Sequence, residues 1–173
     1  YGDVFFCGCT PELLLRKKGA HVESMALAAI LHDSAKCMSG EQLIEYCIKH
    51  KIKPNEFEAI CKHSPALLHA DVSADLAKKL FKVKKQNVLN AIKYHTLGRL
   101  NMTLEEKILF VADMSSKDRR YAEARKVHQE ALKSLDEGMK AALRVKLLFT
   151  VQTGKWLAGA GIKLWNEIIS KSN

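Results

Sequence analysis

The sequence has few prolines and no long apolar run. Its three prolines stand at positions 11, 54 and 65, and no low-complexity linker or internal repeat divides the chain. No apolar stretch approaches the roughly 20 residues that cross a bilayer. The first residues also lack the basic-then-apolar pattern of a secretory signal. We therefore expect one domain, residues 1–173, in a cytoplasmic protein without a membrane partner.

The cysteines and the familiar phosphate-binding motifs add further exclusions. The five cysteines are an odd set without the spacing of a disulfide framework, which favours a reducing compartment. Cys7 and Cys9 are a weak candidate for a metal pair. Neither a Gly-rich phosphate-binding loop nor a nucleophile elbow is present in the sequence.

Acidic residues are outnumbered by basic ones. The 28 lysines and arginines exceed the 19 aspartates and glutamates, which gives a net charge of +9. Such a charge favours anionic partners such as nucleotides or nucleic acid, although a solvated lysine-rich surface explains it equally well. The run of lysines at 78–85 is read as an exposed helix end in preference to a nucleic-acid site.

Almost every segment shows the 3.6-residue spacing of amphipathic helices, and strand-like alternation is scarce. The sequence therefore predicts an all-α fold. Pro54 breaks one helical segment, Ser64 and Pro65 suit the start of the next, and Thr103 with Glu106 suits a capping box that starts another. Besides the helix that starts at Thr103, the expected helices cover residues 11–19, 23–36, 40–62, 65–81, 85–96, 120–134 and 136–153.

Several apolar helices carry a histidine or an aspartate at or beside the predicted buried face. His32 and Asp33 close the apolar run 25–31, His69 and His95 share faces with apolar residues, and Asp113 extends another apolar face. An imidazole or a carboxylate is costly to bury without a partner, and a divalent metal suits both. One such histidine is more often a hydrogen-bonded core residue, but the joint pattern predicts a metal centre. Nitrogen and carboxylate ligands together favour Fe, Mn, Co or Zn over Ca or Mg.

The stretches that contain these residues resemble the HD-domain metal-dependent phosphohydrolases. The resemblance is greater to one branch, the symmetrical bis(5'-nucleosyl)-tetraphosphatases, which hydrolyse diadenosine tetraphosphate. Its most specific part is the block His-Thr-x-Gly-Arg-x-Asn-Met, which begins at His95. The resemblance is collinear from residue 11 to the C-terminus, through residues 29–36, 67–69, 91–104 and 106–113.

Carried over residue by residue, the resemblance implies a centre of two iron ions bridged by Asp33, beside a phosphate pocket. The implied metal ligands are His32, Asp33, His69, His95 and Asp113. The implied catalytic residues are Asp33, Lys36 and Arg99, and the implied substrate-binding residues are Lys36, Thr96, Gly98 and Arg99. These roles are chemically reasonable, because lysine offers a point charge and arginine a planar fork to a phosphate. Lys36 follows His32 by one helical turn, so a continuous helix would place both on the same face.

The sequence also departs from the family. The family has a further metal-binding histidine on its first helix, and this sequence has no histidine before His21. Counting back along the resemblance reaches Asp3, which is the candidate replacement, and the segment 7–11 interrupts the expected helix. Because the family's extra histidine is a metal ligand, its absence here concerns the binding of one of the two metals.

Three functions follow from these observations. The first is two-metal hydrolysis of diadenosine tetraphosphate to two ADP. The second is a nucleotidase or phosphodiesterase that acts on other nucleotides, and the third is a degenerate HD domain that binds nucleotide or RNA without cleaving it. The first is our main interpretation, with a nucleotide as the partner in preference to nucleic acid, and the resemblance implies a homodimer.

Overall fold

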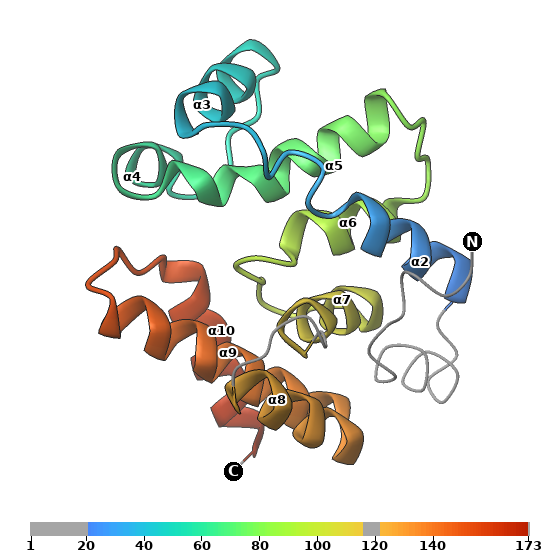
Figure 1. The fold of residues 1–173 in the computed structure, drawn as a ribbon, viewed down its shortest axis with the longest axis vertical. Helices are drawn as coiled ribbons and strands as arrows, with labels where there is room; N and C mark the ends of the chain where they lie inside the picture. The colour runs from blue at the N-terminus through green and yellow to red at the C-terminus, as the bar shows by residue number, and fades with distance from the viewer. Residues whose placement is uncertain (1–20, 116–121, 173) are drawn as a thin grey trace.

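The computed structural model describes residues 21–115 and 122–172, and all of the regular structure in these ranges is helical. The all-α prediction is confirmed. Figure 1 shows α3, α4 and α5 at one end of the molecule, α8, α9 and α10 at the other, and α2, α6 and α7 between them. Within the described ranges, every helix is too short or too polar to cross a membrane. The helices are α2 (Val22–Leu31), α3 (Gly40–Lys49), α4 (Phe57–His63), the 3-10 helix η1 (Pro65–Leu68), α5 (His69–Lys79), α6 (Gln86–Tyr94), α7 (Leu104–Ser115), α8 (Ala122–Lys133), α9 (Leu135–Gln152) and α10 (Gly159–Ser172).

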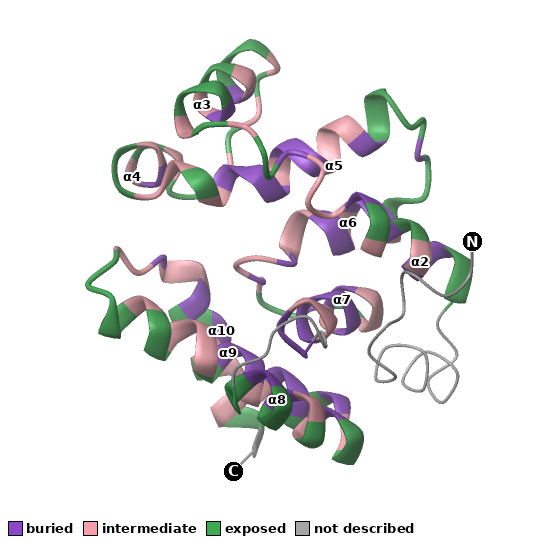
Figure 2. Cartoon of the chain, viewed as in Figure 1, coloured by how far each residue is buried: buried purple, intermediate pink, exposed green. Residues whose placement is uncertain are grey.

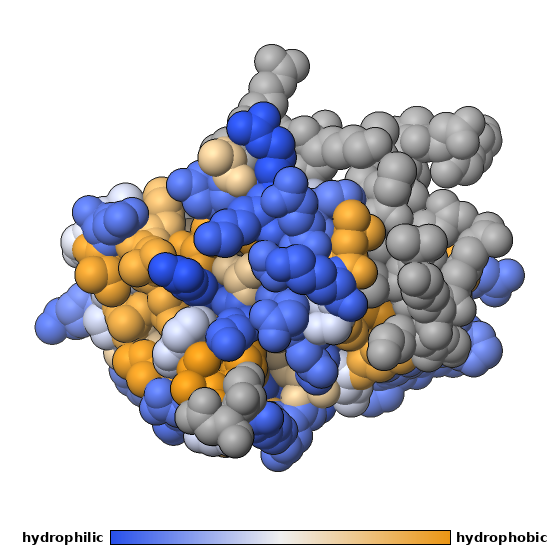
Figure 3. Space-filling view, turned by 90° about the horizontal axis from the view of Figure 1, so that it is seen from below, coloured by the Kyte–Doolittle hydropathy of each residue, from blue (hydrophilic) through white to orange (hydrophobic). Residues whose placement is uncertain are grey.

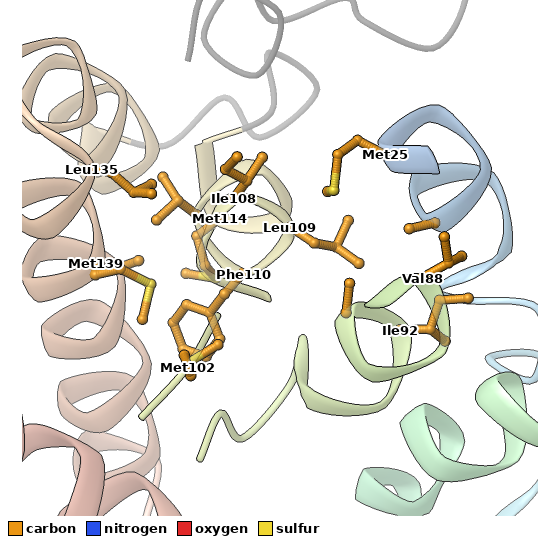
Figure 4. Close-up of a cluster of buried hydrophobic side chains, with 14 of the residues drawn as sticks. Met25, Val88, Ile92, Met102, Ile108, Leu109, Phe110, Met114, Leu135 and Met139 are labelled. Atoms are coloured by element: carbon orange, nitrogen blue, oxygen red, sulfur yellow. The ribbon is translucent and has the colours of Figure 1, made fainter. Parts of the chain in front are cut away.

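Helix α7 is the centre of the larger hydrophobic core. It lies between Met25, Val88 and Ile92 on one side and Leu135 and Met139 on the other (Figure 4). None of its residues is exposed, and even the charged Glu106 is buried, so the helix is surrounded by the rest of the fold. Figure 2 shows the resulting concentration of buried residues along α5, α6 and α7, while the outer helices keep exposed faces.

A smaller core joins α3, α4, η1 and α5. Leu43 and Cys47 of α3 are at most 1% exposed and pack with Leu68 and Val72. Trp156, from the segment between α9 and α10, packs against this cluster from the far end of the chain. The C-terminal part therefore contacts both cores, because Leu164 of α10 belongs to the larger one.

The predicted helices that fall on the described residues are confirmed with shifted ends. The break at Pro54 separates α3 from α4. Ser64 is the N-cap residue and Pro65 stands in the first turn, as predicted, but the Ser64 side chain makes no capping hydrogen bond. Pro65 begins a 3-10 helix that leads into α5, and not an α-helix. The capping box is confirmed: the Thr103 N–H donates to Glu106 Oε2 (3.1 Å), and the Glu106 N–H donates to Thr103 Oγ1 (3.4 Å).

The helix predicted for 23–36 ends earlier, at Leu31. Residues 32–37 form successive turns instead of a further α-helical turn. The N–H of Ala35 donates to Ser73 Oγ on α5 (3.0 Å), so a tertiary partner replaces the helical carbonyl. The predicted helix 11–19, together with Asp3 and the Cys7 and Cys9 pair, lies outside the described residues.

Candidate metal centre

The predicted ligand residues lie at the ends of three helices. His32 is the C-cap of α2 with Asp33 directly after it, His69 is the first residue of α5, and His95 is the C-cap of α6. These helices pack against one another, with α6 in contact with both α2 and α5. Residues that are far apart in the sequence therefore meet where the helices end.

All three imidazoles are held in the same way. In His32, His69 and His95, Nδ1 lies 2.7, 2.5 and 2.7 Å from the carbonyl oxygen of the residue three positions earlier. Since a carbonyl only accepts, Nδ1 carries the proton in each ring and Nε2 of a neutral ring presents its lone pair. This arrangement is how proteins commonly orient histidines that bind a metal through Nε2.

The Nε2 atoms converge on the carboxylate of Asp33. Asp33 Oδ1 lies 3.2 Å from His69 Nε2 and 3.5 Å from His95 Nε2, and Asp33 Oδ2 lies 3.7 Å from His32 Nε2. The Nε2 atoms of His69 and His95 are 3.2 Å apart. His32, Asp33 and His95 each contribute a ligand atom within 4.8 Å of the other two.

The electrostatics of this cluster call for a bound cation. Burial lowers the pKa of His95, although its hydrogen bonds with Asp33 and with the Ile92 carbonyl act in the opposite direction. Burial alone would raise the pKa of Asp33, but its hydrogen bonds with His69 and His95 outweigh burial and hold that pKa well below its usual range. The Asp33 carboxylate and the Nε2 atom of a neutral ring both present lone pairs, so contacts of 3.2 to 3.7 Å need a positive charge between them. A proton on Nε2 supplies it in the hydrogen bonds above, and a divalent metal ion supplies it when one is bound. The residues present therefore fit a metal ion.

Thr96 joins this cluster, whereas Gly98 is shaped by packing. Thr96 Oγ1 lies 3.0 Å from His95 Nε2 and 3.2 Å from His69 Nε2, so the hydroxyl predicted to bind substrate is beside the centre. Gly98 has φ +70°, and a Cβ atom there would lie 2.4 Å from Leu164 Cδ2 of α10. Glycine is therefore required at this position by the turn and by the approach of α10, and its role in a phosphate pocket stays a prediction.

The two predicted phosphate-binding cations differ in their surroundings. The Lys36 side chain is 60% exposed and its Nζ lies 3.4 Å from Asp33 Oδ1. It reaches the centre from a turn, since α2 has already ended, so the same-face argument does not apply to it. Arg99 donates two hydrogen bonds to the fully buried Glu106 and its guanidinium also lies 4.9 Å from the ring centroid of Tyr94. Its binding of phosphate stays a prediction.

Asp113 lies beside a lysine that the sequence reasoning missed. Lys146 Nζ is 3.7 Å from Asp113 Oδ2 and donates hydrogen bonds to the carbonyl oxygens of His95 (2.9 Å) and Thr96 (3.1 Å). Asp113 is not part of the three-ligand group found among the described residues. The signal for Lys146 was present in the sequence, because this lysine interrupts an apolar run in α9.

A cavity of about 770 Å³ adjoins the centre. Its polar side includes Lys36, His95, Thr96 and Asp113. Its apolar side comes from α9 and the segment before α10, with Leu143, Leu147, Phe149, Trp156 and Leu157. Sequence reasoning could not place this cavity, since its walls come from distant parts of the chain.

Hydrophobic surface continues beyond the cavity along the end of α9. Leu148, Phe149 and Val151 are 47%, 56% and 63% exposed. In the view from below, hydrophobic side chains gather on the left of the molecule beside a hydrophilic band (Figure 3).

An all-helical scaffold that brings histidines and an aspartate from separate helix ends onto one point defines a class of metal-binding hydrolases. The chain belongs to the HD domain family, whose characteristic sequence matches residues 8–118. This region contains His32, Asp33, His69, His95 and Asp113, and Asp3 lies outside it.

Proteins of known name resemble most of the chain. A symmetrical bis(5'-nucleosyl)-tetraphosphatase of Bacillus subtilis is 28% identical over 159 residues, which cover 92% of this chain and 83% of that protein. A tetraphosphatase of the same name from Halalkalibacterium halodurans is 28% identical over 156 residues, covering 90% of this chain and 81% of its own. The crystal structure of a predicted HD superfamily hydrolase involved in NAD metabolism, from Clostridium acetobutylicum, is similar with a TM-score of 0.86. It is 29% identical and covers 94% of this chain and 85% of that one.

Proposed function

We propose that this chain is a metal-dependent phosphohydrolase that cleaves dinucleoside polyphosphates symmetrically, with diadenosine tetraphosphate giving two ADP. One observation carries the proposal: the Nε2 atoms of His69 and His95 lie 3.2 and 3.5 Å from one oxygen of Asp33. The proposal takes its substrate from the names of the relatives, which resemble the chain over nine tenths of its length.

His32, Asp33, His69 and His95 would hold the metal, with Asp113 as a further candidate. A bound divalent ion supplies Lewis acidity and lowers the pKa of water, so that hydroxide is available at neutral pH. Imidazole and carboxylate donors suit Fe, Mn, Co or Zn, and a pair of iron ions is what the resemblance implies. Asp33 serves this centre as an anion at every pH in the physiological range, because its pKa is held well below its usual value by His69 and His95 against the effect of burial.

The remaining residues would bind and orient the substrate. Lys36 is exposed at the edge of the centre and would attract a phosphate as a point charge. Thr96 Oγ1, which lies 3.0 Å from His95 Nε2, would form a hydrogen bond with the substrate. The apolar wall of the cavity, which includes Leu147 and Trp156, offers a nucleobase a surface to stack and pack against. Positioning and charge neutralisation of this kind are the main contributions that a protein makes to phosphoryl transfer.

The test is a turnover assay on protein purified without oxygen and loaded with Fe(II) or Mn(II). Diadenosine tetraphosphate should yield ADP as its only nucleotide product, measured by chromatography. Asp33→Asn should lose both bound metal and turnover, while Asp136→Asn, which changes an exposed aspartate on α9, should keep both.

The two alternatives give different results in the same assay. If diadenosine tetraphosphate is untouched while another nucleotide is hydrolysed, the chain is a nucleotidase or phosphodiesterase. If nucleotides bind without turnover and less than one metal is present per chain, the chain is a degenerate HD domain.

The assembly of the protein and its cellular location are also proposals. We expect a cytoplasmic homodimer, by resemblance to the family. Sedimentation equilibrium of the metal-loaded protein tests the assembly, and a monomer at micromolar concentration contradicts it.

A further inference from the structure

Lys146 is fixed on the wall of the cavity by contacts from two other parts of the chain, the end of α6 and helix α7. Its Nζ donates to the carbonyl oxygens of His95 and Thr96 and lies 3.7 Å from Asp113 Oδ2. It also lies 4.1 Å from the ring centroid of Phe110. The Lys146 side chain is 20% exposed and that of Asp113 is 17% exposed. This ammonium is therefore a built part of the site and not a mobile surface charge.

The carbonyl groups that Lys146 binds belong to residues of the metal centre. The His95 ring lies against Asp33 and Thr96 Oγ1 lies beside the His69 and His95 rings, while the carbonyl oxygens of His95 and Thr96 accept from Lys146. They follow the C-terminus of α6, where the helix dipole favours a positive charge. Lys146 thus occupies the position beside this centre where electrostatics would otherwise attract a second cation.

The ligands for two metal ions are also incomplete among the described residues. One group of three, His32, Asp33 and His95, is assembled there, with His69 at 3.2 Å from both Asp33 and His95. Asp113 is not part of that group. A divalent ion on Asp113 would meet the ammonium of Lys146 in a partly buried site, where repulsion between like charges is weakly screened.

We propose that this chain holds one metal ion through Asp33 and the surrounding histidines, and that Lys146, paired with Asp113, supplies the positive charge of a second ion. The inference rests on the proposed function, because it concerns how the same centre neutralises the phosphates of a nucleotide. Lys146 lines the cavity together with Lys36 and Thr96, so its charge acts on whatever anion occupies that space. It is a positioning and electrostatic residue and not a metal ligand.

The first test is the metal content of protein loaded with Mn(II) and freed of loosely bound ions, measured by mass spectrometry of the metal. We expect one ion per chain in the unaltered protein and in Asp113→Asn. Two ions per chain, or loss of the ion in Asp113→Asn, overturns the inference and leaves the proposed hydrolase intact. A content near zero in the unaltered protein overturns the metal centre itself, so the two failures are distinguishable.

The second test is the affinity for ADP, measured by calorimetry on the Mn(II)-loaded protein. Lys146→Met should bind ADP at least tenfold more weakly while it keeps its one metal ion, and Lys146→Arg should restore most of the affinity. Lys140→Met, on the same helix but outside the cavity lining, is the matched control and should bind ADP as the unaltered protein does. Unchanged ADP binding in Lys146→Met overturns the inference. If that variant does not fold, the metal content of Asp113→Asn still decides the inference, because asparagine keeps a group that can form a hydrogen bond with Lys146.

Discussion

Arg99 donates two hydrogen bonds to Glu106, from Nε to Oε2 at 3.0 Å and from Nη2 to Oε1 at 2.9 Å. The Glu106 side chain is completely buried and that of Arg99 is 36% exposed. Glu106 also accepts from the Thr103 N–H at the start of α7. The arginine expected to bind phosphate is therefore the counter-ion of a buried acid, and its removal affects the fold as well as the site.

Arg99→Ala should destabilise the protein by about 3 kcal/mol, because it leaves the buried carboxylate of Glu106 without its positive partner. The double variant Arg99→Ala/Glu106→Gln should recover part of this loss, since the buried charge is then gone. Urea unfolding followed by circular dichroism measures both. Equal stability of Arg99→Ala and the unaltered protein would contradict the structural role of this ion pair.

Arg99 is expected to affect both the stability of the fold and the binding of phosphate, whereas Lys36→Ala should affect the binding of phosphate alone. The Lys36 side chain is 60% exposed, so its removal should change the free energy of unfolding by no more than about 0.5 kcal/mol. Turnover should nevertheless fall, since a phosphate loses a nearby positive charge. A substantial loss of stability, or unchanged turnover on a dinucleoside polyphosphate, would count against the placement of Lys36 at the edge of the site.

The sequence indicated which polar residues lie close together better than it indicated their surroundings. His32, Asp33, His69 and His95 could be recognised because each polar side chain follows or interrupts an apolar helical face. Lys146 was missed, although it lies in the same kind of pattern, because a lysine in an apolar run is usually explained by its long stem reaching solvent. Its partners, two carbonyl groups at the end of another helix, are visible only in three dimensions.

The ends of the helices were predicted correctly where residues close in the sequence determine them. The capping box of Thr103 and Glu106 is a local signal, and it marks the start of α7 correctly. The end of α2 is not local, because the N–H of Ala35 binds Ser73 on another helix. Helix ends that depend on a distant hydroxyl cannot be found from spacing alone.

Gly98→Ala should destabilise the protein more than Gly154→Ala. Both glycines have a positive φ, +70° and +64°, so alanine is strained at both positions, by about 1 kcal/mol or more. Only Gly98 has a neighbour that a Cβ would strike, Leu164 Cδ2 at 2.4 Å, whereas nothing lies within 4 Å at Gly154. Thermal unfolding compares the two variants directly. Equal losses of stability in the two variants would mean that α10 can move away from residue 98 at no cost in free energy, which would contradict the close packing of Leu164 on Gly98.

The metal-free protein should become less stable as the pH falls from 7 to 5. Burial lowers the pKa of His95 in the folded state. Below the ordinary histidine pKa of about 6.5, the unfolded chain therefore binds a proton at this residue more readily than the folded chain, which favours unfolding. The loss from this residue can reach about 1.4 kcal/mol per pH unit. Asp33 adds nothing in this window, because its folded pKa is held well below the usual range and its stabilising contribution declines only below about pH 4.

Urea unfolding at several pH values measures this slope, and His95→Gln, with no group that titrates, should flatten it. A stability that is constant or rises between pH 7 and 5 would contradict the neutral state of buried His95.

Cys37 and Cys47 should differ strongly in their reactivity toward iodoacetamide. Burial raises the pKa of Cys47 to about 12, and charges of Asp71, Cys61 and Asp75 add to the effect, so its thiolate is scarce at pH 8. Cys37 is exposed in the turn that follows Asp33. Alkylation depends on both thiolate and access, so Cys47 should be modified at least about a hundredfold more slowly than Cys37 in the folded protein. Peptide mapping by mass spectrometry resolves the individual thiols, and a denatured sample, in which both react alike, is the control. Rapid modification of Cys47 without unfolding would show that the smaller core, in which α3 packs on α5, opens readily in solution.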